Sequence, residues 1–407
     1  MSKSYEPPIP PKPLPIDQNW ALLGGRSPQE FMKAFWHKKP LLVRGAIPAF
    51  NLAKAQNTPL DSPISTKTLL QFAQSPDCES RLVHSNPWSL SSGPLSKKDI
   101  PQLEDPNWTI LLQGMEAVHP AAAKILSWFR FIPDARLDDL MISIAGPGGG
   151  VGPHFDSYDV FLIQMSGRRR WKISEQTDLS LKPSLPLKIL KHFKAEFVWD
   201  LEPGDMLYLP PHIAHEGIAL DPGCQTWSVG FRAPSYQELL QEGLWRLAES
   251  LEDLPHLASH FADPLQNATD KAEQLPGELI RQLEGKLRAL RLQDIDTFLP
   301  GITAYLSEPK PQAIFVGRDD LTPAAFAQQL SKQDLLPHPQ TRILSLGETV
   351  FCNGENVTQN EAPAIQEAWK KLSKFKALPA GFPVGKEAQT SLLQAFRSGW
   401  LEFTKEQ

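Results

Sequence analysis

Short apolar runs set the pattern of residues 22–234. Each run is rich in β-branched and aromatic side chains and is bounded by glycine, proline or polar turn residues, and the runs cover 40–46, 140–146, 159–165, 168–173, 196–201, 205–210 and 225–232. Runs of this kind predict β-strands. Helical spacing is seen only in 27–36, 66–74 and 120–132. We therefore predict an all-β domain, an antiparallel sandwich or barrel with helical decoration.

The pattern changes after Ser235. Residues 235–251 begin with the capping-box pair Ser235 and Glu238 and continue with an apolar stripe at helical spacing. A second amphipathic helix is predicted over 278–292. We expect residues 235–302 to form a helical linker or dimerisation region, and the chain to be a homodimer.

The last part of the chain, 303–407, predicts a small α+β domain. A helix near 322–332 precedes a strand at 342–346 and a hairpin at 349–358, whose turn is Asn353-Gly354. Helices are predicted near 363–375 and 387–404. This order matches a winged helix, but no basic recognition stripe accompanies it. We therefore expect a packing or interaction domain and no direct nucleic-acid binding.

Composition narrows the class of protein. The chain has 407 residues, enough for two or three domains, and a formal net charge of -5, which does not favour general binding to nucleic acid.

Six prolines between Pro7 and Pro15 predict an extended, mobile leader at 1–21. The remaining boundaries that we predict are 22–234 for the β domain, 235–302 for the helical region and 303–407 for the C-terminal domain.

The cysteines and the apolar segments bear on location. Three separated cysteines, Cys78, Cys224 and Cys352, cannot form a disulfide framework or a thiolate zinc site. We find neither the apolar core of a signal peptide nor a stretch of about 18 apolar residues. We therefore expect a cytoplasmic protein without a membrane segment.

Candidate chemistry begins with His154 and Asp156, which follow a glycine-rich approach at 146–152. Residues i and i+2 of a strand point to the same face, so an imidazole and a carboxylate can converge on one ion. Two histidines and one carboxylate on one side of a metal are typical of non-haem iron(II) oxygenases. A single His-x-Asp is common without a metal, so a second histidine is needed.

That second histidine lies in 201–217. A strand is predicted to end at Pro210-Pro211, and a short loop after it presents either His212 or His215. The residues alone do not choose between them.

Strand parity singles out Arg169. The runs 159–165 and 168–173 are predicted to form a hairpin that turns at Ser166-Gly167. On its return strand Arg169 shares a face with Trp171 and Ile173. That face points inward, so a guanidinium lies inside a small barrel, which is costly unless it meets an anion. A dicarboxylate cosubstrate is one candidate anion and an internal Asp or Glu is the other.

Four stretches together resemble the JmjC-type 2-oxoglutarate oxygenases, and more closely the bacterial ribosomal oxygenases that hydroxylate an arginine of a large-subunit ribosomal protein. They are FWHKKPLLVRGAIP, DDLMISIAGPGGGVGPHFDSYDVFLIQMSGRRRW, LEPGDMLYLPPHIAHEG and SVGFRAP. The resemblance implies a double-stranded β-helix (the cupin or JmjC barrel), followed by a helical dimerisation region and a winged-helix-like C-terminal domain.

The resemblance also implies roles for residues. His154, Asp156 and His215 become the iron(II) ligands, and Arg169 grips the distal carboxylate of 2-oxoglutarate. Ser228 is a weaker candidate contact to the same cosubstrate. Tyr158 shares the face of the first two ligands and is a candidate for the substrate entrance, although we favour an ordinary core tyrosine.

The function that the resemblance implies is hydroxylation of an arginine of a ribosomal protein, with iron(II), 2-oxoglutarate and dioxygen. A second reading with the same iron chemistry is hydroxylation of another residue, such as histidine, or demethylation. A third, of another class, is a non-catalytic cupin-like module that binds ribosomes. The candidate ligands at all three metal positions, with Arg169, argue against the third.

Overall fold

The computed structural model describes residues 3–11, 14–254, 257–262, 264, 275–291, 294–318, 320–358 and 362–404. Two compact units make up the chain, 1–233 and 234–407. Parts of the predicted leader and of the helical region lie outside the described residues. Among those that are described, no helix combines the length and the apolar character that crossing a membrane requires.

The first unit is mostly strands, as predicted. Its strands are β1 (Lys3–Ser4), β2 (Leu41–Val43), β3 (Leu60–Asp61), β4 (Ser80–Ser85), β5 (Trp88–Ser92), β6 (Trp108–Leu112), β7 (Leu137–Ala145), β8 (Val160–Ser166), β9 (Arg169–Ser174), β10 (Phe197–Leu201), β11 (Met206–Leu209), β12 (Ala214–Ala219) and β13 (Cys224–Phe231). Its helices are η1 (Ala21–Leu23), α1 (Pro28–Ala34), α2 (Pro48–Ala55), α3 (Thr66–Phe72), η2 (Lys97–Asp99), α4 (Met115–Val118), α5 (Pro120–Ser127) and η3 (Asp134–Arg136).

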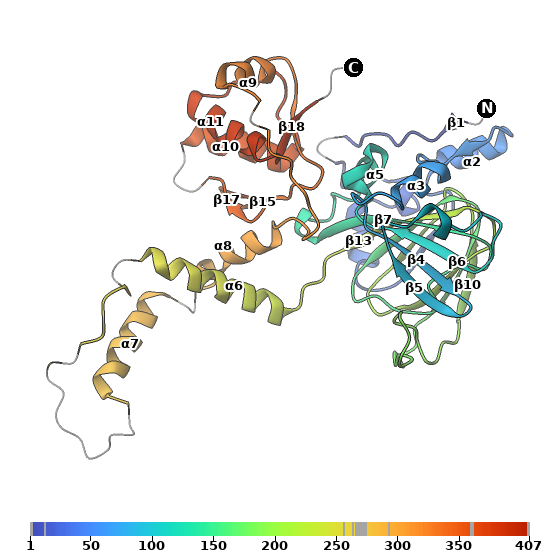
Figure 1. The fold of residues 1–407 in the computed structure, drawn as a ribbon, viewed down its shortest axis with the longest axis horizontal. Helices are drawn as coiled ribbons and strands as arrows, with labels where there is room; N and C mark the ends of the chain where they lie inside the picture. The colour runs from blue at the N-terminus through green and yellow to red at the C-terminus, as the bar shows by residue number, and fades with distance from the viewer. Residues whose placement is uncertain are drawn as a thin grey trace. The chain divides into compact units, whose positions relative to one another are not determined.

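Two sheets face each other in this unit and form the predicted barrel (Figure 1). The larger sheet has the order β2-β11-β8-β13-β7-β6-β4-β5, and the smaller one has the order β10-β9-β12. Consecutive strands β8 and β9 therefore do not pair with each other, and the hairpin that we predicted there is wrong. The turn at Ser166-Gly167, where Gly167 has φ +61°, carries the chain from one sheet to the other instead.

Alternate residues along the strands of the larger sheet face either the hydrophobic core or a cavity inside the barrel. On β13, Trp227 and Val229 are buried in the hydrophobic core with the α1, α3 and α5 helices, whereas Thr226 and Ser228 line a cavity inside the barrel. Strands β6, β7 and β8 divide in the same way. The outer face of the sheet therefore holds the core together, and the inner face is left for a site.

The described part of the predicted leader lies against the first unit. Strand β1 pairs in parallel with β3, and the indole of Trp128 donates a hydrogen bond of 2.9 Å to the carbonyl of Pro8. Tyr5 packs against Phe50 with the two rings tilted and their centroids 5.3 Å apart.

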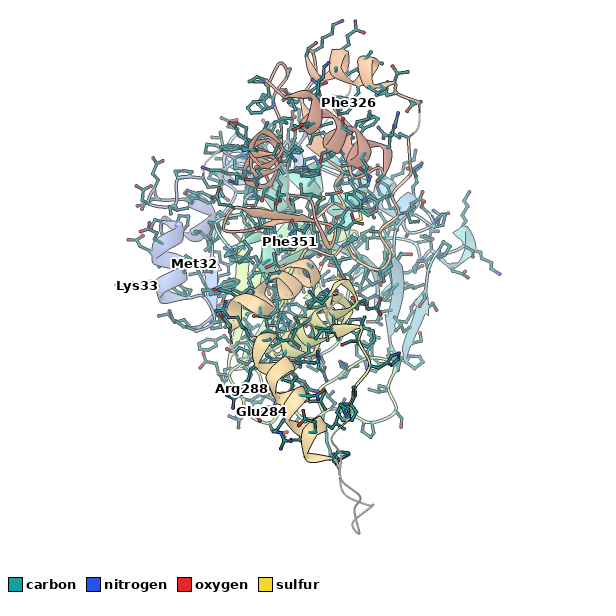
Figure 2. The ribbon with its side chains drawn as sticks, turned by 90° about the vertical axis from the view of Figure 1, so that its left-hand side faces the viewer. Met32, Lys33, Glu284, Arg288, Phe326 and Phe351 are labelled. Carbon is teal, nitrogen blue, oxygen red and sulfur yellow. The ribbon has the colours of Figure 1, made fainter. Side chains whose placement is uncertain are left out.

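The second unit contains helices α6 (Tyr236–Ser250), η4 (Leu251–Asp253), α7 (Gly277–Ala289), α8 (Ile295–Leu306), α9 (Pro323–Leu330), α10 (Pro363–Phe375) and α11 (Lys386–Arg397), and strands β14 (Leu335–Pro337), β15 (Ile343–Leu346), β16 (Thr349–Cys352), β17 (Glu355–Asn356) and β18 (Leu401–Phe403). Phe326 and Trp369 lie in its own core (Figure 2 labels Phe326). Glu284 and Arg288, labelled in the same view, form an ion pair one turn apart on α7.

One helix of this unit is shorter than predicted. The helix expected over 387–404 ends at Arg397, since Gly399 adopts a left-handed φ of +75° and the chain continues as β18, paired with β14. The sequence pattern also failed to predict α8, which contains Pro300 and Gly301. Strand β14 was not predicted either, and the other helices and strands in 303–407 follow the predicted order.

Candidate metal centre

The glycine-rich approach to His154 packs closely on neighbouring backbone. A Cβ at Gly149 would lie 2.0 Å from the carbonyl oxygen of Trp108, and one at Gly150 would lie 2.4 Å from that of Gly217. No other residue type fits at these two positions without a shift of the backbone. The glycines therefore let this segment lie against β6 and β12 just before His154.

A backbone bridge places the two histidines side by side. His154 and His215 exchange both N–H···O hydrogen bonds, at 2.9 and 2.8 Å, and their ring centroids are 4.2 Å apart. Asp156 Oδ2 lies 3.6 Å from His215 Nε2. One ligand atom from each of these three residues lies within 4.8 Å of the others, so the predicted triad converges in space on a volume suited to one metal ion.

Hydrogen bonds select the imidazole nitrogens that face this volume. His154 Nδ1 donates to the carbonyl of Gly152 at 2.9 Å, and His215 Nδ1 donates to that of Ile213 at 2.8 Å, because a carbonyl oxygen can only accept. Each Nε2 is then left with its lone pair for a metal. Burial, together with His154, lowers the pKa of His215 to about 4 against the opposing effect of Asp156. Near neutral pH this imidazole is uncharged, as a ligand must be.

The other candidate histidine, His212, does not join the cluster. Its side chain is exposed and its φ is +66°, and its backbone N–H donates to the carbonyl of Asp156 at 2.7 Å. The short loop that was expected to present His215 ends earlier, since His215 lies within strand β12.

Separate substitutions of the two histidines should have unequal effects. We expect His215→Ala to lose metal-dependent turnover. His212→Ala should keep most of it, because the hydrogen bond from His212 to Asp156 comes from the backbone N–H, which the substitution retains. Cobalt(II) binding measured by calorimetry, beside turnover, checks this. A severe His212→Ala with a mild His215→Ala would exchange the two assignments.

Arg169 lies inside the barrel, as its parity predicted, and is 4% exposed. Its Nη2 donates to Ser143 Oγ at 3.4 Å, and its Nε has no hydrogen-bond partner among the residues that the structure describes. Arg170, on the other face of the strand, instead forms an ion pair of 2.7 Å with Asp200. Within the described residues no such carboxylate neutralises Arg169. A buried guanidinium without an anion costs several kcal/mol, so this position fits an anionic ligand.

A cavity of about 130 Å³ connects Arg169 with the metal triad. Ser228 lines it from β13 and is 7% exposed. The structure thus brings together every site residue that the sequence analysis named, except His212. The contact of Ser228 with a cosubstrate stays a prediction.

Acidic residues that the sequence pattern did not predict lie at the end of this cavity away from Arg169. Asp138 and Asp139 line it, and Asp139 lies four residues along β7 from Ser143, about 13 Å away. Tyr158 is 38% exposed and lines the same end, so the expectation of a core tyrosine is wrong. Burial and the carboxylates of Asp156, Asp139 and Asp138 raise the pKa of Tyr158. The pair Asp138 and Asp139 is adjacent in sequence, but only the topology shows that it meets the site.

Comparison with known proteins relates this chain to JmjC-domain proteins. Residues 124–239 match the family model of the JmjC domain. The chain is 35% identical over 356 residues to the ribosomal protein uL16 3-hydroxylase of Escherichia coli (strain K12), which covers 83% of this chain and 87% of that protein.

Solved structures of the Escherichia coli ribosomal oxygenase YcfD share the fold. One X-ray structure has a TM-score of 0.75 at 31% identity and covers 92% of this chain and 98% of that one. Another, in complex with cobalt and 2-oxoglutarate, has a TM-score of 0.74 at 30% identity and covers 93% and 98% of the two chains.

Proposed function

Because this chain belongs to the JmjC-domain ribosomal oxygenases, we propose that it is an iron(II)- and 2-oxoglutarate-dependent hydroxylase of an arginine side chain in a large-subunit ribosomal protein. The buried guanidinium of Arg169 carries the proposal: it lies at one end of a cavity that holds the metal triad and pairs with no carboxylate among the described residues.

In this proposal His154, Asp156 and His215 hold the iron. Two neutral imidazoles and one carboxylate are the donor set of non-haem iron(II) oxygenases. When bound, iron(II) supplies an oxidation in which 2-oxoglutarate and dioxygen yield succinate and carbon dioxide while one oxygen atom enters a substrate C–H bond. The protein's share is to fix the ligands, through the backbone bridge and the two Nδ1–H donors, and to orient the other reactants.

Arg169 binds the distal carboxylate of 2-oxoglutarate. A guanidinium can donate two parallel hydrogen bonds to a carboxylate, and such a pair would neutralise the buried charge. Ser228 is proposed as a second contact from the opposite wall.

The acidic end of the cavity supports arginine as the target. Asp138 and Asp139 supply negative charge there, and a Cβ placed at Gly230 would lie 3.7 Å from Asp139 Oδ1 and 3.9 Å from Tyr158 Cε2. A carboxylate and an aromatic ring around an open position suit a guanidinium, which forms ion pairs and stacks on rings. A neutral imidazole would gain less from the two charges, so histidine is the weaker alternative.

The helical region supports the proposed homodimer. Leu240, Leu244 and Trp245 on α6 are each more than half exposed, and Leu240 and Leu244 lie one turn apart on one face. A second copy of this helix could cover that face, which light scattering would detect as a doubled mass.

We also propose a cytoplasmic location, in keeping with three buried cysteines that form no disulfide.

Mass spectrometry of ribosomal proteins tests the substrate. In cells that carry the gene we expect one large-subunit protein to gain one oxygen atom on an arginine, and in cells without it, or with the Asp156→Ala variant, we expect no such gain. The same oxygen found on a histidine would favour the alternative residue. No change in any ribosomal protein would refute the proposed function.

A further inference from the structure

Trp171 has a buried hydrogen-bond donor that no group in the described part of the chain uses. Its side chain is 6% exposed, and within the described residues its indole Nε1 has no hydrogen-bond partner. Buried indole N–H groups usually find an acceptor, since an unmade bond leaves the full cost of desolvation. Because Trp171 lines the cavity of the metal centre, a ligand in that cavity is the natural source of an acceptor.

Strand register shows where along the cavity the indole lies. On the β9–β12 ladder Arg169 is opposite Ala219, Trp171 is opposite Gly217, and Ile173 is opposite His215. Two residues of a strand span about 6.6 Å. Trp171 therefore lies between the guanidinium at one level and the metal ligand His215 at the next.

Gly217 leaves room for the indole ring of Trp171. A Cβ at this position would lie 2.7 Å from a carbon of the six-membered ring of Trp171. The ring thus takes the space that a side chain at 217 would fill, and its centroid is 5.9 Å from that of His215. The indole forms one wall of the segment that joins Arg169 to the triad.

We propose that Trp171 is a further cosubstrate-binding residue, whose indole N–H donates a hydrogen bond to an oxygen of bound 2-oxoglutarate. This rests on the proposed function, in which 2-oxoglutarate extends from Arg169 to the metal and so passes Trp171. An indole can only donate, and this cosubstrate offers two carboxylates and a keto oxygen along its length.

Trp227 offers a matched control from the same barrel. It is fully buried and its Nε1 likewise has no partner among the described residues. It lies on the outer face of β13, in the hydrophobic core, whereas its neighbours Thr226 and Ser228 line the cavity. Replacing Trp227 by Phe removes the same kind of buried indole donor, but away from the ligand.

Calorimetric titration of 2-oxoglutarate into the cobalt(II)-loaded full chain tests the proposal. A hydrogen bond to a charged group is worth about tenfold or more in affinity. We therefore expect Trp171→Phe to raise the Kd of 2-oxoglutarate at least about tenfold without changing cobalt(II) affinity, and Trp227→Phe to leave both unchanged. Equal 2-oxoglutarate binding by Trp171→Phe and the unaltered protein would overturn the inference. Failure of the unaltered protein to bind 2-oxoglutarate would instead overturn the proposed function.

An isosteric replacement separates the hydrogen bond from ring packing. Incorporation of 3-benzothienylalanine at position 171 keeps both fused rings and replaces the N–H by sulfur, so it also serves if Trp171→Phe does not fold. We expect this form to bind 2-oxoglutarate as weakly as Trp171→Phe. Binding as tight as that of the unaltered protein would show that the ring matters only through packing, and the proposal would be wrong.

Discussion

Asp156→Ala should abolish hydroxylation and leave the fold intact. The substitution removes the carboxylate of the triad, and loss of groups that merely support metal ligands already costs about 10–100-fold in activity or metal affinity. The fold should survive because the Asp156 side chain is partly exposed and its backbone carbonyl still accepts from His212 N–H. Succinate formation with added iron(II) and 2-oxoglutarate measures the loss, and circular dichroism and thermal melting check the fold.

A matched control for this variant is Asp178→Ala, since Asp178 is exposed and its carboxylate accepts a hydrogen bond of 3.1 Å from the backbone N–H of nearby Ser180. It should retain full turnover. Normal succinate formation by Asp156→Ala would refute the assignment of the metal centre, whatever the fate of the control.

Arg169→Met should separate cosubstrate binding from stability. Without the guanidinium the distal carboxylate loses its charged partner, and breaking a buried pair on one side costs about 3–5 kcal/mol. We expect the KM for 2-oxoglutarate to rise about a hundredfold or more. In the absence of cosubstrate the melting temperature should stay level or rise, because Met, an apolar side chain of similar length, replaces a buried charge that pairs with no carboxylate in the part of the chain that the structure describes.

Arg170→Met, on the other face of the same strand, is the control. Arg170 is exposed and paired with Asp200, so both cosubstrate dependence and stability should change little. An unchanged dependence on 2-oxoglutarate in Arg169→Met would contradict the role of Arg169. A large fall in melting temperature without ligand would instead indicate an internal partner for the guanidinium.

Parity along a strand needs no knowledge of its partners, and this is why the sequence sufficed to place Arg169. The inward face of 168–173 follows from Trp171 and Ile173 whether or not the strand forms a hairpin with 159–165. Which strands pair is decided by long-range packing, and the hairpin prediction was wrong for that reason. The place of Asp139 on the wall of the cavity that holds the triad also depends on long-range strand pairing and was not predicted.

Composition explains two missed elements. Strand β12 reads AHEGIA, with small and polar residues where β-branched ones mark strands, because Gly217 yields its space to Trp171. Helix α8 contains Pro300 and Gly301, which are ordinarily read as breakers. Gly301 packs on α6, where a Cβ would lie 3.2 Å from Arg246 Cβ. Close packing of the two helices therefore favours glycine at this position, although glycine in a sequence pattern argues against a helix.

The alternation of core and cavity positions along β13 has a consequence for how such an enzyme can change. Trp227 and Val229 pack in the hydrophobic core, while Thr226 and Ser228, their immediate neighbours, line the cavity. If the cavity holds 2-oxoglutarate as proposed, a substitution of Ser228 changes the wall that the cosubstrate faces and leaves the core packing of Trp227 and Val229 in place. One strand thus carries positions that face the site and positions that hold the scaffold.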